Sequence, residues 1–214
     1  KETLTSQCFD LCFVSTVSAM TTTCYERPRL IYRDAVKIGE YEEFNRIISK
    51  HLKRFIGKYD KSLAVVMRED SEEEKRFFSE IFMDSCHLFP RTPNTDNSFN
   101  FDTYHIMSRS RLIISMASSA IFEVSAENKK ILQVDFSSAG QYLLKQSGSH
   151  FWQLTNDSYG AFEDTLKTII DMKDEIYVSE SASAARHVCQ YDQNHSVVEK
   201  IRNFIINSLS ERSR

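Results

Sequence analysis

Residues 112–123 read Leu-Ile-Ile-Ser-Met-Ala-Ser-Ser-Ala-Ile-Phe-Glu, and this stretch decides the fold. An apolar run leads through a turn of small residues straight into a helical pattern, which is typical of a buried parallel strand and its crossover helix. N–H groups at the start of that helix would face the strand exit, so the turn could bind an anion without glycine. Ser118 and Ser119 could add hydroxyl donors. Alternatively, one of them is the helix N-cap and Glu123 is a solvated first-turn acid, and both readings can hold together.

The same alternation of short apolar runs and helical segments extends along the chain. We therefore expect an α/β fold, a Rossmann-like open parallel sheet of five or six strands with helices on both faces. The predicted strands are Phe9–Ser15, Leu63–Arg68, Cys86–Phe89, Leu112–Met116, Ile131–Phe136 and Phe151–Leu154. Outside the segment quoted above, the predicted helices are Glu40–Ile56, Ser71–Phe82, Phe101–Met107, Ala139–Lys145, Tyr159–Met172, Glu175–Val188 and Val197–Leu209.

Length and composition favour one domain. The chain has 214 residues with only 5 Gly and 3 Pro, and it shows no repeat and no linker. We expect a single Rossmann-like domain over residues 1–214, with the α/β core at 8–172 and C-terminal helices at 173–214. Because the chain begins at Lys1 without a signal peptide or an initiator Met, it could be a fragment of a larger two-domain enzyme.

Net charge and cysteine content restrict the kinds of binding partner and the cellular compartment that we expect. The 27 Lys and Arg against 30 Asp and Glu give a net charge of −3, so we expect no nucleic-acid partner. Five irregularly spaced Cys favour reduced, buried thiols and a cytoplasmic protein. Cys8 and Cys12 would share one face of an extended strand, where core packing is the favoured reading over metal binding.

Several motif-bound chemistries are excluded. The scattered glycines form no dinucleotide fingerprint, no P-loop and no nucleophile elbow. The sequence also lacks the common zinc and divalent-metal spacings, so we expect no metal site and no cofactor.

The candidate site follows from the expected sheet, because ligands of open parallel sheets bind beyond the carboxyl ends of the strands. The polar residues at those exits include Ser15, Thr16, Arg68, Arg91, Ser118, Ser119 and Asp135. Each arginine could hold a phosphate or carboxylate with its planar fork, or simply reach solvent. His87 and His105 are the histidines expected nearest this site, although a lone histidine is more often structural.

Several of these segments resemble the C-terminal, nucleotide-sugar-binding half of a GT-B type glycosyltransferase. The chain is similar to bacterial surface-carbohydrate transferases of the Kdo and sialic-acid kind. The segments that carry the resemblance are the opening strand Phe9–Ser15, the stretch Tyr104–Ser119 with its Ser-Ser turn, Glu123 in the helix, and the next strand at Lys130–Asp135. Two positions depart from the family pattern: Met116 or Ala117 replaces a glycine before the turn, and Asn128 replaces one after the helix.

The resemblance implies the donor-binding domain of a metal-independent glycosyltransferase of surface polysaccharide or glycan synthesis. Its donor would be a sugar nucleotide, with a CMP-linked sugar as one candidate, and its acceptor a glycan or lipid-linked molecule. Ser118 and Ser119 would hold the donor phosphate, Glu123 would meet the sugar or ribose, and Arg68 would neutralise negative charge. The acceptor-binding second domain, through which a peripheral membrane association is possible, is missing.

Two alternatives stay open. A non-catalytic Rossmann-like interaction or regulatory domain would use the basic helix face from Arg46 to Lys58 to meet a partner. A related sugar-nucleotide epimerase would need a cluster of carboxylates and histidines between two domains.

Overall fold

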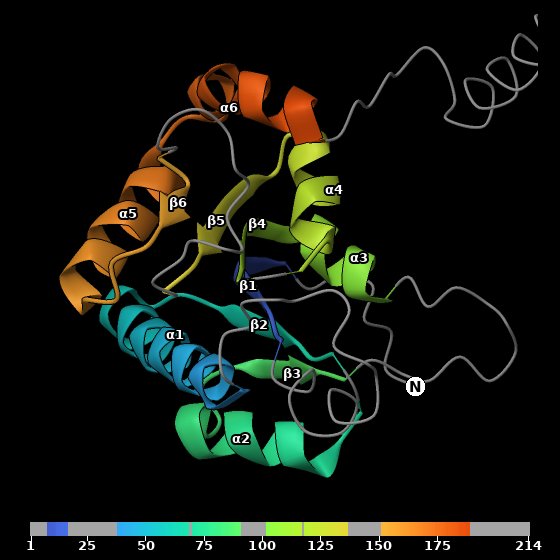
Figure 1. Cartoon of the computed structure of the whole chain (residues 1–214), viewed down its shortest axis with the longest axis vertical. Coiled ribbons are helices and arrows are strands. Elements are labelled where there is room, and N and C mark those ends of the chain that lie inside the picture. Colours follow the sequence, from blue (N-terminus) through green and yellow to red (C-terminus); the bar gives the residue numbers. More distant parts are fainter. Residues whose placement is uncertain are drawn as a thin grey trace, which may run out of the picture.

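The computed structural model describes residues 8–16, 38–68, 70–90, 102–116, 118–136 and 151–188. In this part of the chain six parallel strands form one sheet, in the order β3-β2-β1-β4-β5-β6 (Figure 1). The strands are β1 (Phe9–Val14), β2 (Leu63–Val66), β3 (His87–Phe89), β4 (Ser110–Ser115), β5 (Lys130–Val134) and β6 (Gln153–Leu154). The predicted open parallel sheet is therefore confirmed, with six strands.

Helices cover both faces of the sheet. The helices are α1 (Ile38–Tyr59), α2 (Glu72–Phe82), α3 (Asp102–Ser108), α4 (Ala120–Ala126), α5 (Tyr159–Asp171) and α6 (Asp174–Val188). On one face α1 lies between α2 and α5, and on the other α3 and α4 pack on the central strands while α6 packs on α4 (Figure 1). The chain thus changes faces between α5 and α6. The predicted helices 139–145 and 197–209 lie outside the described residues.

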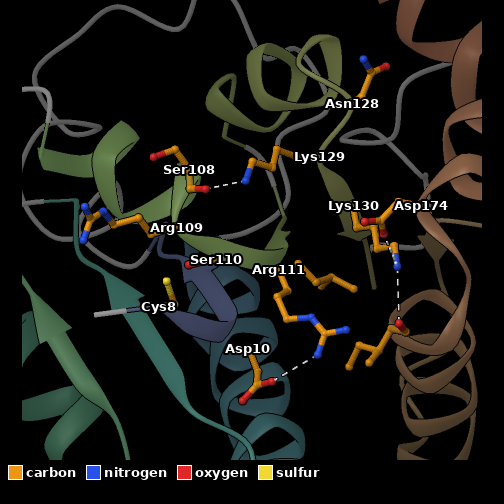
Figure 2. Close-up of a pocket in the computed structure, with 12 residues that line it drawn as sticks. Cys8, Asp10, Ser108, Arg109, Ser110, Arg111, Asn128, Lys129, Lys130 and Asp174 are labelled. Atoms are coloured by element: carbon orange, nitrogen blue, oxygen red, sulfur yellow. Dashed lines mark hydrogen bonds and ion pairs between the residues drawn. The ribbon is translucent and has the colours of Figure 1, made fainter. Parts of the chain in front are cut away.

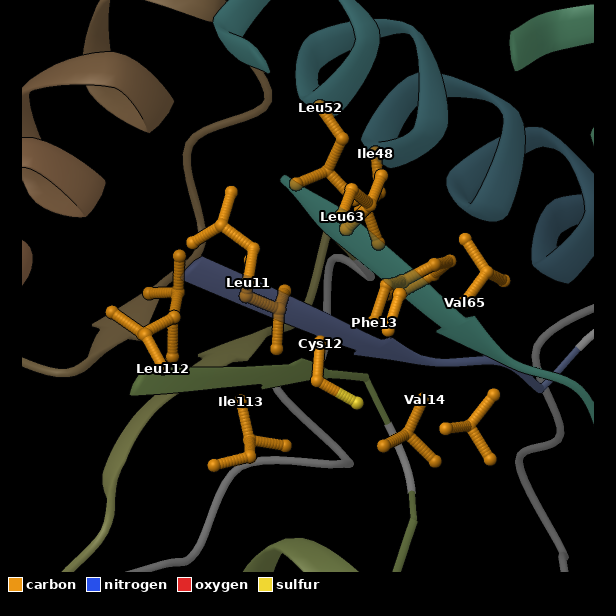
Figure 3. Close-up of a cluster of buried hydrophobic side chains, with 14 of the residues drawn as sticks. Leu11, Cys12, Phe13, Val14, Ile48, Leu52, Leu63, Val65, Leu112 and Ile113 are labelled. Atoms are coloured by element: carbon orange, nitrogen blue, oxygen red, sulfur yellow. The ribbon is translucent and has the colours of Figure 1, made fainter. Parts of the chain in front are cut away.

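The core lies along the two central strands. Leu11 and Phe13 of β1 face α1, whereas Cys12 points to the opposite face, and all three are fully buried (Figure 3). Burial raises the pKa of the Cys12 thiol to about 12, so this cysteine is a neutral core residue. Cys8, by contrast, is exposed just before β1, so the expected pair of core cysteines is only half right.

Local signals explain where the helices begin and end. Ser71 caps α2, with its hydroxyl accepting the N–H of Glu74 at 3.2 Å. α4 ends in a Schellman motif, in which the N–H of Asn128 donates to Ser125 and that of Lys129 donates to Val124. Asn128 has a φ of 62°, the left-handed conformation that Gly and Asn tolerate best. Asn128 can therefore replace the family's glycine at little cost.

None of the helices within the described ranges is long and apolar enough to cross a membrane.

Candidate ligand-binding crevice

The strand order creates a topological switch point between β1 and β4. These strands are neighbours, but the chain continues from β1 toward β2 on one side and from β4 toward β5 on the other (Figure 1). In open α/β sheets the crevice at such a switch point, beyond the carboxyl ends of the strands, is where ligands bind. Val14 is in register with Ser115, so the exits of β1 and β4 adjoin. The predicted residues Ser15, Thr16 and Ser118 come from these two exits.

Ser15 is held at the β1 exit by a buried carboxylate. Its hydroxyl donates to Oε1 of Glu74 at 2.5 Å, and the same oxygen accepts the N–H of Arg68 at 3.2 Å. Glu74 is 1% exposed, although it lies in the first turn of α2. One carboxylate therefore joins the exits of β1 and β2 to the start of α2.

Thr16 makes a second buried contact at the same exit. It is 6% exposed, and its hydroxyl accepts from Nδ2 of the fully buried Asn45 in α1 at 3.1 Å. The two residues that follow β1 are thus fixed by two different helices, Ser15 by α2 and Thr16 by α1. A rigid exit of this kind holds backbone and hydroxyl groups in place before a ligand arrives.

At the β4 exit the two serines have different roles. The hydroxyl of Ser118 accepts the N–H of Ala120 at 3.3 Å, and the N–H of Ser118 donates to the fully buried Ser115 hydroxyl at 3.3 Å. Ser119 is exposed, has helical backbone angles and makes no side-chain cap bond. Ser118 is therefore the residue that caps α4, and Ser119 presents an exposed hydroxyl.

The charged candidates lie on the solvent side. Glu123 is exposed on α4 and its Oε2 accepts the hydroxyl of Tyr104 in α3 at 2.7 Å. The Arg68 side chain is exposed at the end of β2. Arg91 lies outside the described residues.

The expectation that His87 and His105 lie nearest the site was wrong. His87 begins β3, which places it at the amino edge of the sheet, where its ring meets Phe9 with the centroids 5.3 Å apart. His105 is exposed in the last turn of α3. Because the helices of a parallel sheet run opposite to its strands, that turn also lies toward the amino edge.

Sequence reasoning missed two buried polar residues near the carboxyl edge, Asn45 and Glu74. Glu74 belongs to a run of three first-turn glutamates, yet it shares the helical face of Phe77, Phe78 and Ile81. Asn45 likewise shares a face with Ile48 and Leu52. A polar residue inside an apolar helical stripe was the signal that could have revealed both.

The basic face of α1 contacts its neighbouring helices. The guanidinium carbon of Arg46 lies 4.9 Å from the ring centroid of Phe77 in α2, and that of Arg54 lies 3.8 Å from Tyr159 in α5. Nζ of Lys58 is 2.8 Å from a carboxylate oxygen of Glu163. Lys50, Lys53, Arg54 and Lys58 nonetheless remain exposed, so these contacts leave much of the basic face accessible.

A cavity of about 660 Å³ lies at the opposite, amino edge of the sheet, beside the first residues of β1, β4 and β5. It contains none of the predicted site residues. Within the described ranges, His, Cys, Asp and Glu form no group of three or more that could hold a metal ion.

No family model and no curated protein matches the chain. Among solved structures it is similar to UDP-GlcNAc 2-epimerase from Neisseria meningitidis bound to UDP-GlcNAc, with a TM-score of 0.46 and 8% identity. The similarity covers 86% of this chain and 44% of that one, so the chain spans less than half of that protein's length. The Rossmann-like assignment itself rests on the strand order and the parallel pairing described above.

Proposed function

We propose that this chain is the donor-binding domain of a metal-independent glycosyltransferase that uses a sugar nucleotide. The observation that carries the proposal is the switch point, where the exits of β1 and β4 adjoin and place Ser15, Thr16 and Ser118 at the same part of the carboxyl edge. The resemblance of these segments to GT-B donor domains supplies the class of ligand.

Different side chains bind different parts of the sugar-nucleotide donor. Ser119 offers an exposed hydroxyl at the β4 exit, and Arg68 offers a guanidinium at the β2 exit for the phosphates. Glu123, oriented by the Tyr104 hydroxyl, accepts hydroxyl groups of the ribose or sugar. Ser15 and Glu74 keep the crevice wall rigid, because both are too buried to reach far into it.

Catalysis in such a domain is electrostatic. N–H groups and the Arg68 guanidinium stabilise the charge that develops on the departing phosphate as the glycosidic bond to the donor breaks. The acceptor, a glycan or a lipid-linked molecule, is bound by a second domain, which would also bring any peripheral membrane association.

Thermal unfolding with CMP, UDP, GDP, ADP and two sugar nucleotides tests the proposal. A ligand that binds only the folded state stabilises it by about 2.7 kcal/mol at a hundredfold excess over its Kd. We expect one nucleotide class to raise Tm, and the combined Ser118→Ala and Ser119→Ala variant to lose that rise. Ser79→Ala, an exposed serine of α2, is the matched control and keeps the rise.

The comparison uses the ligand-induced rise in Tm and not Tm itself, because removing the Ser118 cap costs about 1 kcal/mol on its own. An equal rise in wild type and in the double variant would mean that the nucleotide binds elsewhere. No rise with any nucleotide at millimolar concentration would contradict donor binding by this chain.

A further inference from the structure

The amino-edge cavity is lined by charged residues that the proposed function does not use. Its polar lining includes Asp10, Ser108, Arg111, Lys129, Lys130 and Asp174, and Leu112 and Ile170 supply apolar surface (Figure 2). A volume of about 660 Å³ falls within the range of small-molecule sites. With Arg109, four cations and two carboxylates surround this space, so the lining is net positive.

Lys129 and Lys130 both donate hydrogen bonds to carbonyl groups at helix ends, but they differ in how many donors remain. Nζ of Lys130 is fully occupied: it donates to the carbonyl of Met172, reaches the carbonyl of Ile170 at 3.4 Å and pairs with Asp174 at 2.9 Å. Lys129 donates to the carbonyl of Ser108, the last residue of α3. An ammonium has three donors, so Lys129 keeps two for another partner.

Arg111 is the least engaged cation. Its Nη1 lies 3.7 Å from Oδ1 of Asp10, which is beyond hydrogen-bond distance. Asp10 already has other partners. Its Oδ2 accepts the N–H and the hydroxyl of Ser62 at 3.0 Å each, and its Oδ1 lies 3.6 Å from Nζ of Lys61. The planar fork of Arg111, 63% exposed at the cavity, is therefore open to a ligand.

Arg111 and Lys129 line the cavity from different sides. Leu112 pairs with Lys130, the first residue of β5, so Lys129 lies just before that strand. In Figure 2 the Lys129 ammonium is directed to Ser108, whereas the Arg111 guanidinium is directed toward Asp10. The Arg109 guanidinium points away from Arg111.

We propose that the amino-edge cavity binds a small phosphate-bearing molecule, with the Arg111 guanidinium holding the phosphate and Lys129 adding positive charge to the cavity wall. A guanidinium offers paired N–H donors that match two phosphate oxygens. Asp10 lowers the affinity because its negative charge repels the phosphate. Removing Asp10 should therefore strengthen binding, and removing Arg111 should weaken it. This site is independent of the sugar-nucleotide crevice, which lies at the other edge of the sheet.

Titration of the full chain with inorganic phosphate and with pyrophosphate, followed by backbone amide NMR at constant ionic strength, tests the proposal. We expect saturable shifts at Arg111, Leu112, Lys129 and Lys130. Arg111→Gln should weaken binding about tenfold or more, since it removes charge-assisted bonds. Asp10→Asn should strengthen binding, since it removes a nearby negative charge. Lys53→Gln, an exposed lysine of α1, is the charge-matched control and leaves binding unchanged.

Arg111 is well exposed, so its variant should fold as the wild type does, and the unperturbed amide spectrum checks this directly. Three results would overturn the proposal: no saturable shift with either anion, shifts confined to carboxyl-edge amides such as Ser15 and Ser118, or equal binding by wild type, Arg111→Gln and Lys53→Gln. The second result would leave the crevice as the anion site and remove only this one.

Discussion

Glu74 is the residue on which the crevice wall depends. Its oxygen Oε1 accepts both the Ser15 hydroxyl and the Arg68 N–H, and the bond from Ser15 is fully buried. Hydrogen bonds to a charged group contribute roughly 1.5–3 kcal/mol, against roughly 0.5–1.5 for neutral ones. We expect Glu74→Gln to lower the free energy of unfolding by about 1–3 kcal/mol, measured by urea denaturation.

Glu73→Gln is the matched control, because it removes an exposed charge from the same helix turn. It should cost less than about 1 kcal/mol, the usual contribution of a charge near a helix N-terminus. In addition, Ser15→Ala should cost much less in the Glu74→Gln background than in wild type, because the two side chains interact directly. Additive effects would show that the 2.5 Å contact contributes nothing.

Asp10 should make stability depend on acid pH. Burial alone would raise the pKa of this carboxyl, but hydrogen bonds from Ser62 and the charges of Lys61 and Arg111 outweigh it and hold the pKa below its ordinary value. A lowered folded-state pKa stabilises the protein above the unfolded value, and this contribution is lost as pH falls through the folded value. Asp10→Asn should therefore be about 1 kcal/mol less stable at pH 7, with the two proteins converging in strong acid.

Thermal unfolding from neutral pH to strong acid measures this convergence. Other carboxylates with lowered pKa, such as those of Glu163 and Asp174, titrate equally in both proteins and cancel in the difference. A constant gap between wild type and variant across the acid range would contradict the role given to Asp10.

At the scale of elements, α1 and α5 are joined by stacked and charged side chains. Arg54 lies over the Tyr159 ring at 3.8 Å, and Nε2 of His51 is 2.7 Å from the Asp157 carbonyl. A cation over an aromatic ring contributes roughly 0.5–1 kcal/mol at exposed sites. Arg54→Ala should therefore lower Tm by about 1–4 °C, whereas the neighbouring exposed Lys53→Ala should leave Tm nearly unchanged. Equal effects of the two variants would make the ring contact irrelevant.

The elements themselves were predictable because their signals are local. Apolar runs gave all six strands, and the apolar spacing from Tyr41 to Phe55 predicted the helix that the structure places at Ile38–Tyr59. Element ends were less accurate: β4 starts two residues early at Ser110, whose hydroxyl bonds to the carbonyl of Ile106. That contact depends on how α3 packs beside β4, and no local pattern encodes it.

At the scale of the molecule, the sequence predicted where ligands would bind but not how the polar groups pair. Strand exits follow from the direction of parallel strands, so Ser15, Thr16 and Ser118 could be named in advance. Their partners Glu74 and Asn45 come from helices far along the chain, and only tertiary packing brings them together. The amino-edge cavity was missed for the same reason, since its lining comes from β1, β4 and β5 and from the ends of α3, α5 and α6.

The sheet should unfold from its edges inward. The central strands β1 and β4 are buried and hydrogen-bonded to strands on both sides, whereas β3 is a three-residue edge strand paired only with β2 and begins with an exposed histidine. Local opening needs less free energy where few buried contacts break. Native-state hydrogen exchange should show amides of Leu11 and Ile113 exchanging only through global unfolding, and amides of β3 at least about a hundredfold faster. Raising the urea concentration should merge the two rates, because global unfolding then dominates both. Equal rates in water would mean that the edge strands belong to the same cooperative unit as the centre.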